Sequence, residues 1–147
     1  STFVLDMLSR KTKYGIKALT YIAREQREDA LVQIGTIAES ENISQKFLES
    51  IMLTLKKAGF VSSRKGKGGG YQLRREPKEI KMVEVMRVLE GPVAMLPCVS
   101  LNYYERCADC KDEDACSVHS LMIQIRDNTL LVLEKNTLAD LVAAASS

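Results

Sequence analysis

All four cysteines and the only histidine of this 147-residue chain lie in one stretch, CVSLNYYERCADCKDEDACSVH, at positions 98–119. Thiolate and imidazole are the side chains that most often bind zinc and iron–sulfur clusters. The stretch has neither helical nor strand periodicity, so packing in a core does not explain its cysteines. The sequence therefore predicts a metal or cluster site with these candidate ligands: Cys98, Cys107, Cys110, Cys116 and His119.

Spacing alone leaves two kinds of site open. A tetrahedral zinc site would use Cys107-x2-Cys110-x5-Cys116-x2-His119 and would leave Cys98 spare. An iron–sulfur cluster would by default use the four thiolates. Its other option is three thiolates with His119, so Cys107 and His119 compete as the fourth ligand.

The thiols are expected to be reduced. No apolar run approaches the roughly 20 residues that span a bilayer. The opening residues STFVLDM lack the basic start and apolar block of a secretory signal, and we take Met7 as the natural start. We therefore expect a cytoplasmic protein with no membrane partner, in which two disulfides are a poor explanation for the cysteines.

Charge is distributed unevenly along the chain, although the net charge is only +2. Between Ser44 and Lys81, ten Lys/Arg residues stand against three Asp/Glu residues, and Arg10 to Arg27 is also basic. The stretch from Cys98 to Cys116 instead has five acids and two bases. A basic front half indicates a polyanionic partner.

The front half has the pattern of three helices. A helix capped by Ser9 is followed by a short helix over residues 34–41 and by a turn at Asn42. Ser44 then caps a third helix, in which apolar residues recur at i, i+3, i+4 and i+7, and Gly59 ends it.

A hairpin and two further helices follow. Two β-prone runs, 60–64 and 71–73, flank a glycine-rich basic turn, which predicts a hairpin rather than a nucleotide-binding loop. Residues 81–90 form an amphipathic helix, and residues 117–135 form a long helix that is apolar on more than one face. Such a helix must be covered on more than one side, and a second subunit is the natural cover. Thr137 and Asp140, spaced as a capping box, predict one short terminal helix.

Helix, short helix, turn, helix and hairpin is the winged helix-turn-helix order. The predicted fold is mainly α with a small β-hairpin: a DNA-binding domain over residues 7–91, a cysteine-rich loop over 92–116, and a dimerisation helix with its tail over 117–147. In this fold the start of the third helix meets base edges and the hairpin meets phosphates. The candidate DNA-binding residues are Ser44, Gln45, Lys46, Phe47, Ser50, Arg64, Lys65 and Lys67.

The runs SRKTKYGIKAL, ISQKFLESIMLTLKKAGFVSSRKGKGGGY and NTLADLV resemble the IscR/NsrR/CymR family of bacterial winged-helix regulators. The resemblance covers residues 7–142. It implies a homodimer that is clasped through the long helix and binds a double-stranded DNA operator of approximate two-fold symmetry. It places Ser44, Lys46, Phe47 and Ser50 at groove-facing positions, and Lys65 at the wing position that enters the minor groove.

Several members of that family hold an iron–sulfur cluster in the corresponding loop. The cluster-assembly regulator has C-x5-C-x5-C-x2-H for a [2Fe–2S] cluster, and Cys110-x5-Cys116-x2-His119 matches its second half. Cys98 falls at the first-ligand position, but eleven residues separate it from Cys110 where the pattern has five, and Cys107 is additional. The resemblance is weaker to the nitric-oxide-sensing branch, which uses an acidic residue where Lys13 stands.

The resulting interpretation is a DNA-binding transcriptional regulator, acting as a repressor, whose DNA binding is controlled by a [2Fe–2S] cluster. The alternative is a zinc-stabilised winged-helix adaptor that binds proteins. An enzyme is disfavoured because no nucleophile–base pair is recognisable. The dithiol pair of Cys107 and Cys110 also has no βαβ pattern around it.

Overall fold

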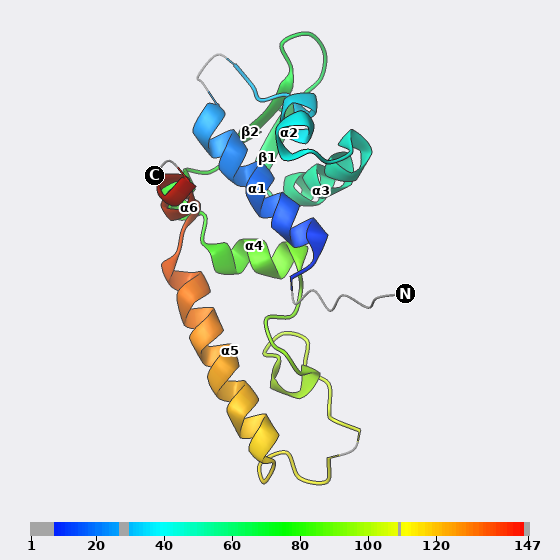
Figure 1. The fold of residues 1–147 in the computed structure, drawn as a ribbon, viewed down its shortest axis with the longest axis vertical. Coiled ribbons are helices and arrows are strands. Elements are labelled where there is room, and N and C mark those ends of the chain that lie inside the picture. The colour runs from blue at the N-terminus through cyan, green and yellow to red at the C-terminus, as the bar shows by residue number, and fades with distance from the viewer. Residues whose placement is uncertain (1–7, 27–29, 109, 146–147) are drawn as a thin grey trace.

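The computed structural model describes residues 8–26, 30–108 and 110–145. Met7, the expected start of the chain, lies outside the described residues. The molecule is elongated, with the winged-helix elements at one end and a long helix running beside the cysteine loop to the other (Figure 1). The elements are α1 (Arg10–Glu25), α2 (Ile34–Glu41), α3 (Gln45–Lys57), β1 (Val61–Arg64), β2 (Gly70–Leu73), η1 (Pro77–Glu79), α4 (Met82–Leu89), η2 (Pro97–Val99), α5 (Ser117–Lys135) and α6 (Leu138–Ala145).

Local signals fix the ends of the first three helices as the sequence predicted. The Ser9 side chain accepts from the Thr12 amide at the start of α1, and Ser44 accepts from the Phe47 amide at the start of α3. Asn42 adopts the left-handed conformation, with φ 54° and ψ 49°, in the turn between α2 and α3. Gly59 follows α3 with φ 84°, a conformation that costs glycine little. These ends aim the start of α3 outward.

The wing is an antiparallel hairpin whose register runs from Val61↔Leu73 to Arg64↔Gly70. Val32 extends this sheet, because its amide and carbonyl both bond to the backbone of Tyr71, at 2.9 and 2.7 Å. Gly70 makes that approach possible: a Cβ there would lie 2.5 Å from the Val32 carbonyl oxygen. The glycines of the wing are therefore required by backbone packing as well as by the turn.

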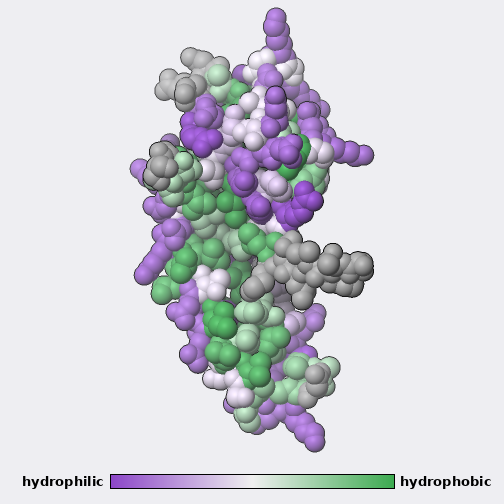
Figure 2. Space-filling model, in the orientation of Figure 1, coloured by the Kyte–Doolittle hydropathy of each residue, from purple (hydrophilic) through white to green (hydrophobic). Residues whose placement is uncertain are grey.

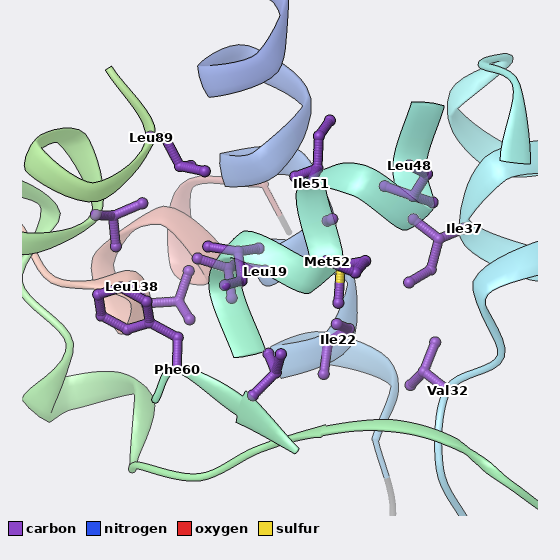
Figure 3. Packing of buried hydrophobic residues seen from close by; sticks show 14 of the residues in the cluster. Leu19, Ile22, Val32, Ile37, Leu48, Ile51, Met52, Phe60, Leu89 and Leu138 are labelled. Atoms are coloured by element: carbon purple, nitrogen blue, oxygen red, sulfur yellow. The ribbon is translucent and has the colours of Figure 1, made fainter. Parts of the chain in front are cut away.

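The core of the DNA-binding end is formed by helices from both ends of the sequence and by the first strand of the wing. Leu19 and Ile22 of α1 pack with Leu48, Ile51 and Met52 of α3, and all five are fully buried (Figure 3). Further core residues come from the other elements: Val32, Ile37, Phe60, Val61, Val85, Leu89 and Leu138. This continuous core holds α3 and the wing in a fixed relation.

Helix α6 packs against α1 and η1, beside the winged-helix core, although it follows the long helix in sequence (Figure 1). Leu138 is fully buried, and its amide donates to the Ile80 carbonyl at 2.8 Å. The predicted capping box forms: the Thr137 amide donates to Asp140 at 2.8 Å, and the Asp140 amide donates to the Thr137 hydroxyl at 3.4 Å. The C-terminal end of α5 is thereby held to the DNA-binding end of the molecule.

The loop before α5 contains one ordered turn that the sequence pattern did not predict. Pro97 begins η2, and Cys98, Val99 and Ser100 are 8%, 2% and 5% exposed. Arg126 of α5 donates to the Val99 carbonyl at 2.9 Å, which fastens this turn to the long helix. Among the described residues, no helix is long and apolar enough to cross a bilayer.

Candidate DNA interface and cysteine site

The start of α3 presents polar side chains to solvent. Ser44, Gln45, Lys46 and Ser50 are exposed. Two of these hydroxyls already have partners, because Ser44 caps the helix and Ser50 donates to the Phe47 carbonyl at 2.7 Å. The Gln45 side-chain amide donates to the Glu49 carboxylate at 3.4 Å, so Gln45 and Glu49 form a polar pair on this face and Lys46 extends beside them toward base edges or phosphates.

Phe47 lies half-buried between α3 and α1 rather than fully exposed. Its ring packs edge-on against Tyr14, with centroids 6.3 Å apart and an interplanar angle of 82°. The Arg10 guanidinium lies 5.9 Å from the Phe47 centroid and 5.8 Å from the Tyr14 centroid. Phe47 thus also sets the angle between the two helices.

A groove of about 610 Å³ separates α3 from the wing. Gln45 and Glu49 line one wall, and Arg64 and Lys65 line the other. Lys56 ties the walls together by donating to the Ser63 hydroxyl at 2.7 Å. Lys67, the third predicted wing cation, is exposed near the tip. The groove thus combines donors for guanine or phosphate with a carboxylate, which can accept from a cytosine amino group.

Tyr71 lies at the floor of this groove. Burial raises the pKa of Tyr71, and the nearby Glu49 carboxylate raises it further. The phenol therefore stays neutral and keeps its O–H as a donor at physiological pH.

The first turn of α1 adds cations that the sequence reasoning did not assign to the interface. Arg10 and Lys11 line a second hollow of about 390 Å³ together with Asn42, Ser44 and Phe47. The basic charge of this segment was visible in the sequence, but its position beside α3 follows from the packing of α1. Cations therefore lie on both sides of α3. When a helix such as α3 enters a major groove, the phosphates that border the groove lie on these two sides.

The fold brings the four cysteines into one neighbourhood. Cys98 is buried in η2, and the other three are half-buried. Cys116 is the N-cap of α5 and its sulfur accepts from the His119 amide at 3.5 Å, while the Cys110 amide donates to the Cys107 carbonyl at 3.3 Å.

Electrostatic coupling between the thiols follows from this proximity. Burial raises the pKa of Cys98, and Glu113, Cys107 and Cys116 raise it further. Burial also raises the pKa of Cys110, and the neighbouring Cys116 thiol adds to that shift. Both groups are therefore neutral thiols near pH 7 until a positive charge favours their ionised forms.

His119 lies next to the cysteines in the first turn of α5, where its amide donates to the Cys116 sulfur. The Nδ1 atom of His119 is buried without a hydrogen-bond partner, which leaves a free lone pair or proton beside the thiols. Within the described parts of the loop and helices, no three His, Cys, Asp or Glu side chains converge on a point that one ion could occupy.

The fold and both sites point to a regulator family, and comparison with known proteins decides which. A model of the Rrf2 family, described as an iron-dependent transcriptional regulator, matches residues 8–144. This chain belongs to the Rrf2 family. It is a transcriptional regulator of the winged-helix type and not an enzyme, which confirms the predicted fold class and the family resemblance.

Several relatives cover nearly the whole chain. An rrf2-like HTH-type regulator of Rhodobacter capsulatus is 38% identical over 142 residues, 95% of each protein. CymR of Bacillus subtilis is 32% identical over 136 residues, 92% of this chain and 89% of CymR.

Two solved structures share the fold of this Rrf2-family chain. The structure of CymR, the global cysteine regulator of B. subtilis, aligns with a TM-score of 0.76 at 31% identity, covering 93% of this chain and 96% of that one. The IscR of T. potens aligns with a TM-score of 0.74 at 31% identity, covering 99% and 91%.

Proposed function

We propose that this Rrf2-family protein is a cytoplasmic homodimeric repressor that binds a double-stranded operator and is controlled by an iron–sulfur cluster in its cysteine loop. The observation that carries the proposal is the placement of two sites on one rigid frame. The exposed start of α3 and the wing lie at one end. The cysteine loop lies beside the N-terminal part of α5, where Cys98 and Cys110 each interact electrostatically with Cys107 and Cys116. The two ends are connected through α5, which contacts α4 and η2 and continues into α6 on the DNA-binding core.

DNA is the partner that the first site suits. The groove between α3 and the wing has cations on its wing side and amide and carboxylate groups on its helix side. A recognition helix of this kind reads bases with its N-terminal residues, while flanking cations neutralise phosphates. Arg10 and Lys11 extend the cationic surface to the opposite flank.

A second copy of the chain is the partner that α5 suits. Helix α5 has no fully buried residue, and Val118, Leu121, Leu131 and Val132 are more than half exposed on one side of it. Figure 2 shows hydrophobic surface gathered over the middle and lower parts of the molecule, away from the hydrophilic wing end. Pairing of two such helices would bury this surface and set two wings facing a symmetric operator.

The cysteine loop is suited to control how the two wings of such a dimer are oriented. When bound, an iron–sulfur cluster supplies metal–thiolate links and a charge that changes with its redox state. Cys98 is fixed to α5 through the Arg126–Val99 hydrogen bond, and Cys116 forms the first cap of α5. Ligation through Cys98 and Cys116 would attach the exposed loop to the N-terminal end of α5. It would thereby shift the population of loop conformations.

A zinc site built from Cys107, Cys110, Cys116 and His119 would not use Cys98 as a ligand. The fold instead brings Cys98 close enough to Cys107 and Cys116 to interact electrostatically. This supports a set of four thiols, with His119 close by as the competing ligand. Because CymR is named a cysteine regulator, family membership alone does not imply a cluster, and the thiol geometry carries that part of the proposal.

Anaerobic purification tests the proposal. We expect coloured protein with iron and acid-labile sulfide in similar amounts, and retardation of a duplex obtained by random-site selection. Cluster removal should change the affinity for that duplex, and a reporter carrying it at the promoter should be repressed. Stoichiometric zinc without iron would exclude the cluster, and failure to retard any selected duplex would exclude the operator.

A further inference from the structure

Three hydrogen bonds in the outer part of the cysteine loop converge on Glu113. Its carboxylate accepts from the Tyr104 hydroxyl at 2.9 Å and from the Cys107 amide at 3.4 Å. Its backbone carbonyl accepts from the Cys116 amide at 3.2 Å. The Glu113 side chain therefore holds the backbone at Cys107, while its backbone carbonyl closes the turn that leads to Cys116.

Apolar packing does not fix the backbone in this outer part of the loop. Tyr104 is 56% exposed and Leu101 is 61% exposed, and the segment lies beside α5 without helix or strand (Figure 1). The inner part is different, because Cys98 is buried in η2 and fixed by Arg126. The position of Cys98 thus comes from packing, whereas the positions of Cys107 and Cys116 depend on hydrogen bonds.

The contacts of Tyr104 also show that a hydrogen bond to Glu113 orders the outer loop. Its hydroxyl lies 2.9 Å from each carboxylate oxygen of Glu113. That hydrogen bond raises the pKa of Tyr104, because the bond would be lost on deprotonation.

We propose that Glu113 is a positioning residue whose carboxylate holds Cys107 in place beside the other thiols before any cofactor is bound. The inference rests on the proposed cluster site for its purpose but not for its test. Closing a flexible segment around a cluster costs conformational entropy, and a loop already held in the closed arrangement pays less of it on binding. Glu113 is not a ligand in this scheme, since its carboxylate is occupied by Tyr104 and Cys107.

Substitutions at three positions distinguish the effect of the Glu113 hydrogen bonds from the effect of changing any side chain in the loop. Glu113→Ala removes the acceptor, whereas Glu113→Gln keeps a carbonyl oxygen that can accept from both donors. Tyr104→Phe removes one donor only. Glu105→Ala is the matched control, because the Glu105 side chain is exposed in the same loop. Within the described part of the loop, Glu105 is bonded through its backbone amide, which donates to the Pro97 carbonyl at 3.1 Å.

Amide hydrogen exchange of the metal-free protein tests the role of Glu113 directly. We expect exchange at the Cys107 amide to become about threefold to tenfold faster in Glu113→Ala, the effect of losing one net hydrogen bond. Tyr104→Phe should give a smaller increase, while Glu113→Gln and Glu105→Ala should match the wild type. Unchanged exchange in Glu113→Ala, or equal damage in Glu113→Gln, would overturn the proposal.

Cluster reconstitution gives a second and independent readout. Glu113→Ala should take up iron and sulfide more slowly than the wild type, by a similar factor, and should reach the same visible spectrum. A changed spectrum would make Glu113 a ligand and would contradict a positioning role. Wild-type protein that takes up no iron would overturn the proposed cluster, while hydrogen exchange would still decide whether Glu113 holds the loop.

Discussion

Glu90, at the end of α4, accepts a hydrogen bond of 2.8 Å from the hydroxyl of Ser9, the residue that caps α1. The Ser9 amide and the Thr12 hydroxyl donate to the same carboxylate. Burial by itself raises the pKa of Glu90, but the hydrogen bonds from Thr12 and Ser9 outweigh it and leave the pKa below its ordinary value. Through this carboxylate, the start of α1 is joined to the end of α4, just before the cysteine loop begins.

Replacement of Glu90 by glutamine should lower stability in a pH-dependent way. The folded-state pKa lies below the unfolded value, so the contribution of the carboxylate is complete above the ordinary glutamate pKa of about 4.3. It is lost as the pH falls through the folded-state pKa. We expect Glu90→Gln to cost about 1 kcal/mol at pH 7, since the site is partly solvated, and less below pH 4.

Urea denaturation at several pH values measures this difference. Glu39→Gln on the exposed face of α2 is the matched control and should leave the free energy of unfolding unchanged at pH 7. A Glu90→Gln deficit that stays constant from pH 7 to pH 3 would mean that the charge of the carboxylate has no part in the contact.

Two lysines should affect DNA binding differently. Lys65 is exposed in the wing and Lys57 is exposed at the end of α3. Lys65→Ala should weaken binding and relax sequence preference beside the contacts of α3, whereas Lys57→Ala should weaken binding uniformly. For about six phosphates neutralised by the dimer, log affinity should fall against log salt with a slope near −5. Each substitution removes one lysine from each subunit and should make that slope shallower by about two. Fluorescence titration of the selected duplex and its variants over a salt series measures both effects, and a slope near zero would contradict them.

Lys11 should behave as a phosphate contact although it lies outside α3 and the wing. It lines the hollow beside Ser44, so Lys11→Ala should weaken binding equally for all duplexes. Lys135→Ala, at the end of α5, is the control and should leave the affinity unchanged. Equal effects of the two substitutions would mean that only overall charge matters.

The parts of the fold that local chemistry decides were predictable from the sequence. The caps at Ser9 and Ser44, the left-handed turn at Asn42 and the glycine after α3 depend on single residues and their near neighbours. The bounds of α2 and α5 followed from their apolar periodicity. The winged-helix order then followed from the order of the elements.

The contacts that position the cysteine site could not be predicted in this way. The turn η2 is held by Arg126 from 27 residues away, and Glu90 meets Ser9 across 81 residues. Glu113 had no distinguishing pattern, because it is one of several acids in an aperiodic loop. The packing of α6 on α1 depends on the length and direction of α5, which periodicity does not give.

Charged substitutions on α5 should separate the dimer. Leu121 and Leu131 are each 51% exposed and lie on the side of α5 that we propose as the interface. Leu131→Asp or Leu121→Asp would place an unpaired charge in a buried apolar contact and should shift micromolar protein to monomer. Leu53→Asp, at an exposed apolar position of α3, is the matched control for oligomeric state. Light scattering of a stable wild-type monomer would rule out this interface.

Substitutions within the cysteine loop should identify the fourth ligand. Cys110→Ala and Cys116→Ala should both abolish the visible chromophore, because both residues belong to either candidate ligand set. If four thiolates bind, Cys107→Ala bleaches the protein and His119→Ala has little effect. If His119 is a ligand, its loss shifts the spectrum while Cys107→Ala is tolerated. Cys98 and Cys110 each interact electrostatically with Cys107 and Cys116, and we expect the first result.

The reduction potential provides a check on the same assignment that does not depend on substitution. A thiolate donates more electron density to iron than a neutral imidazole, so an all-cysteine site should have the lower potential. Its potential should also vary little with pH near neutrality, because no ligand then takes up a proton. A histidine ligand can couple reduction to protonation through its ring nitrogens. A potential that falls steadily as the pH rises from 6 to 8 would therefore assign His119 as a ligand and reject the four-thiolate site.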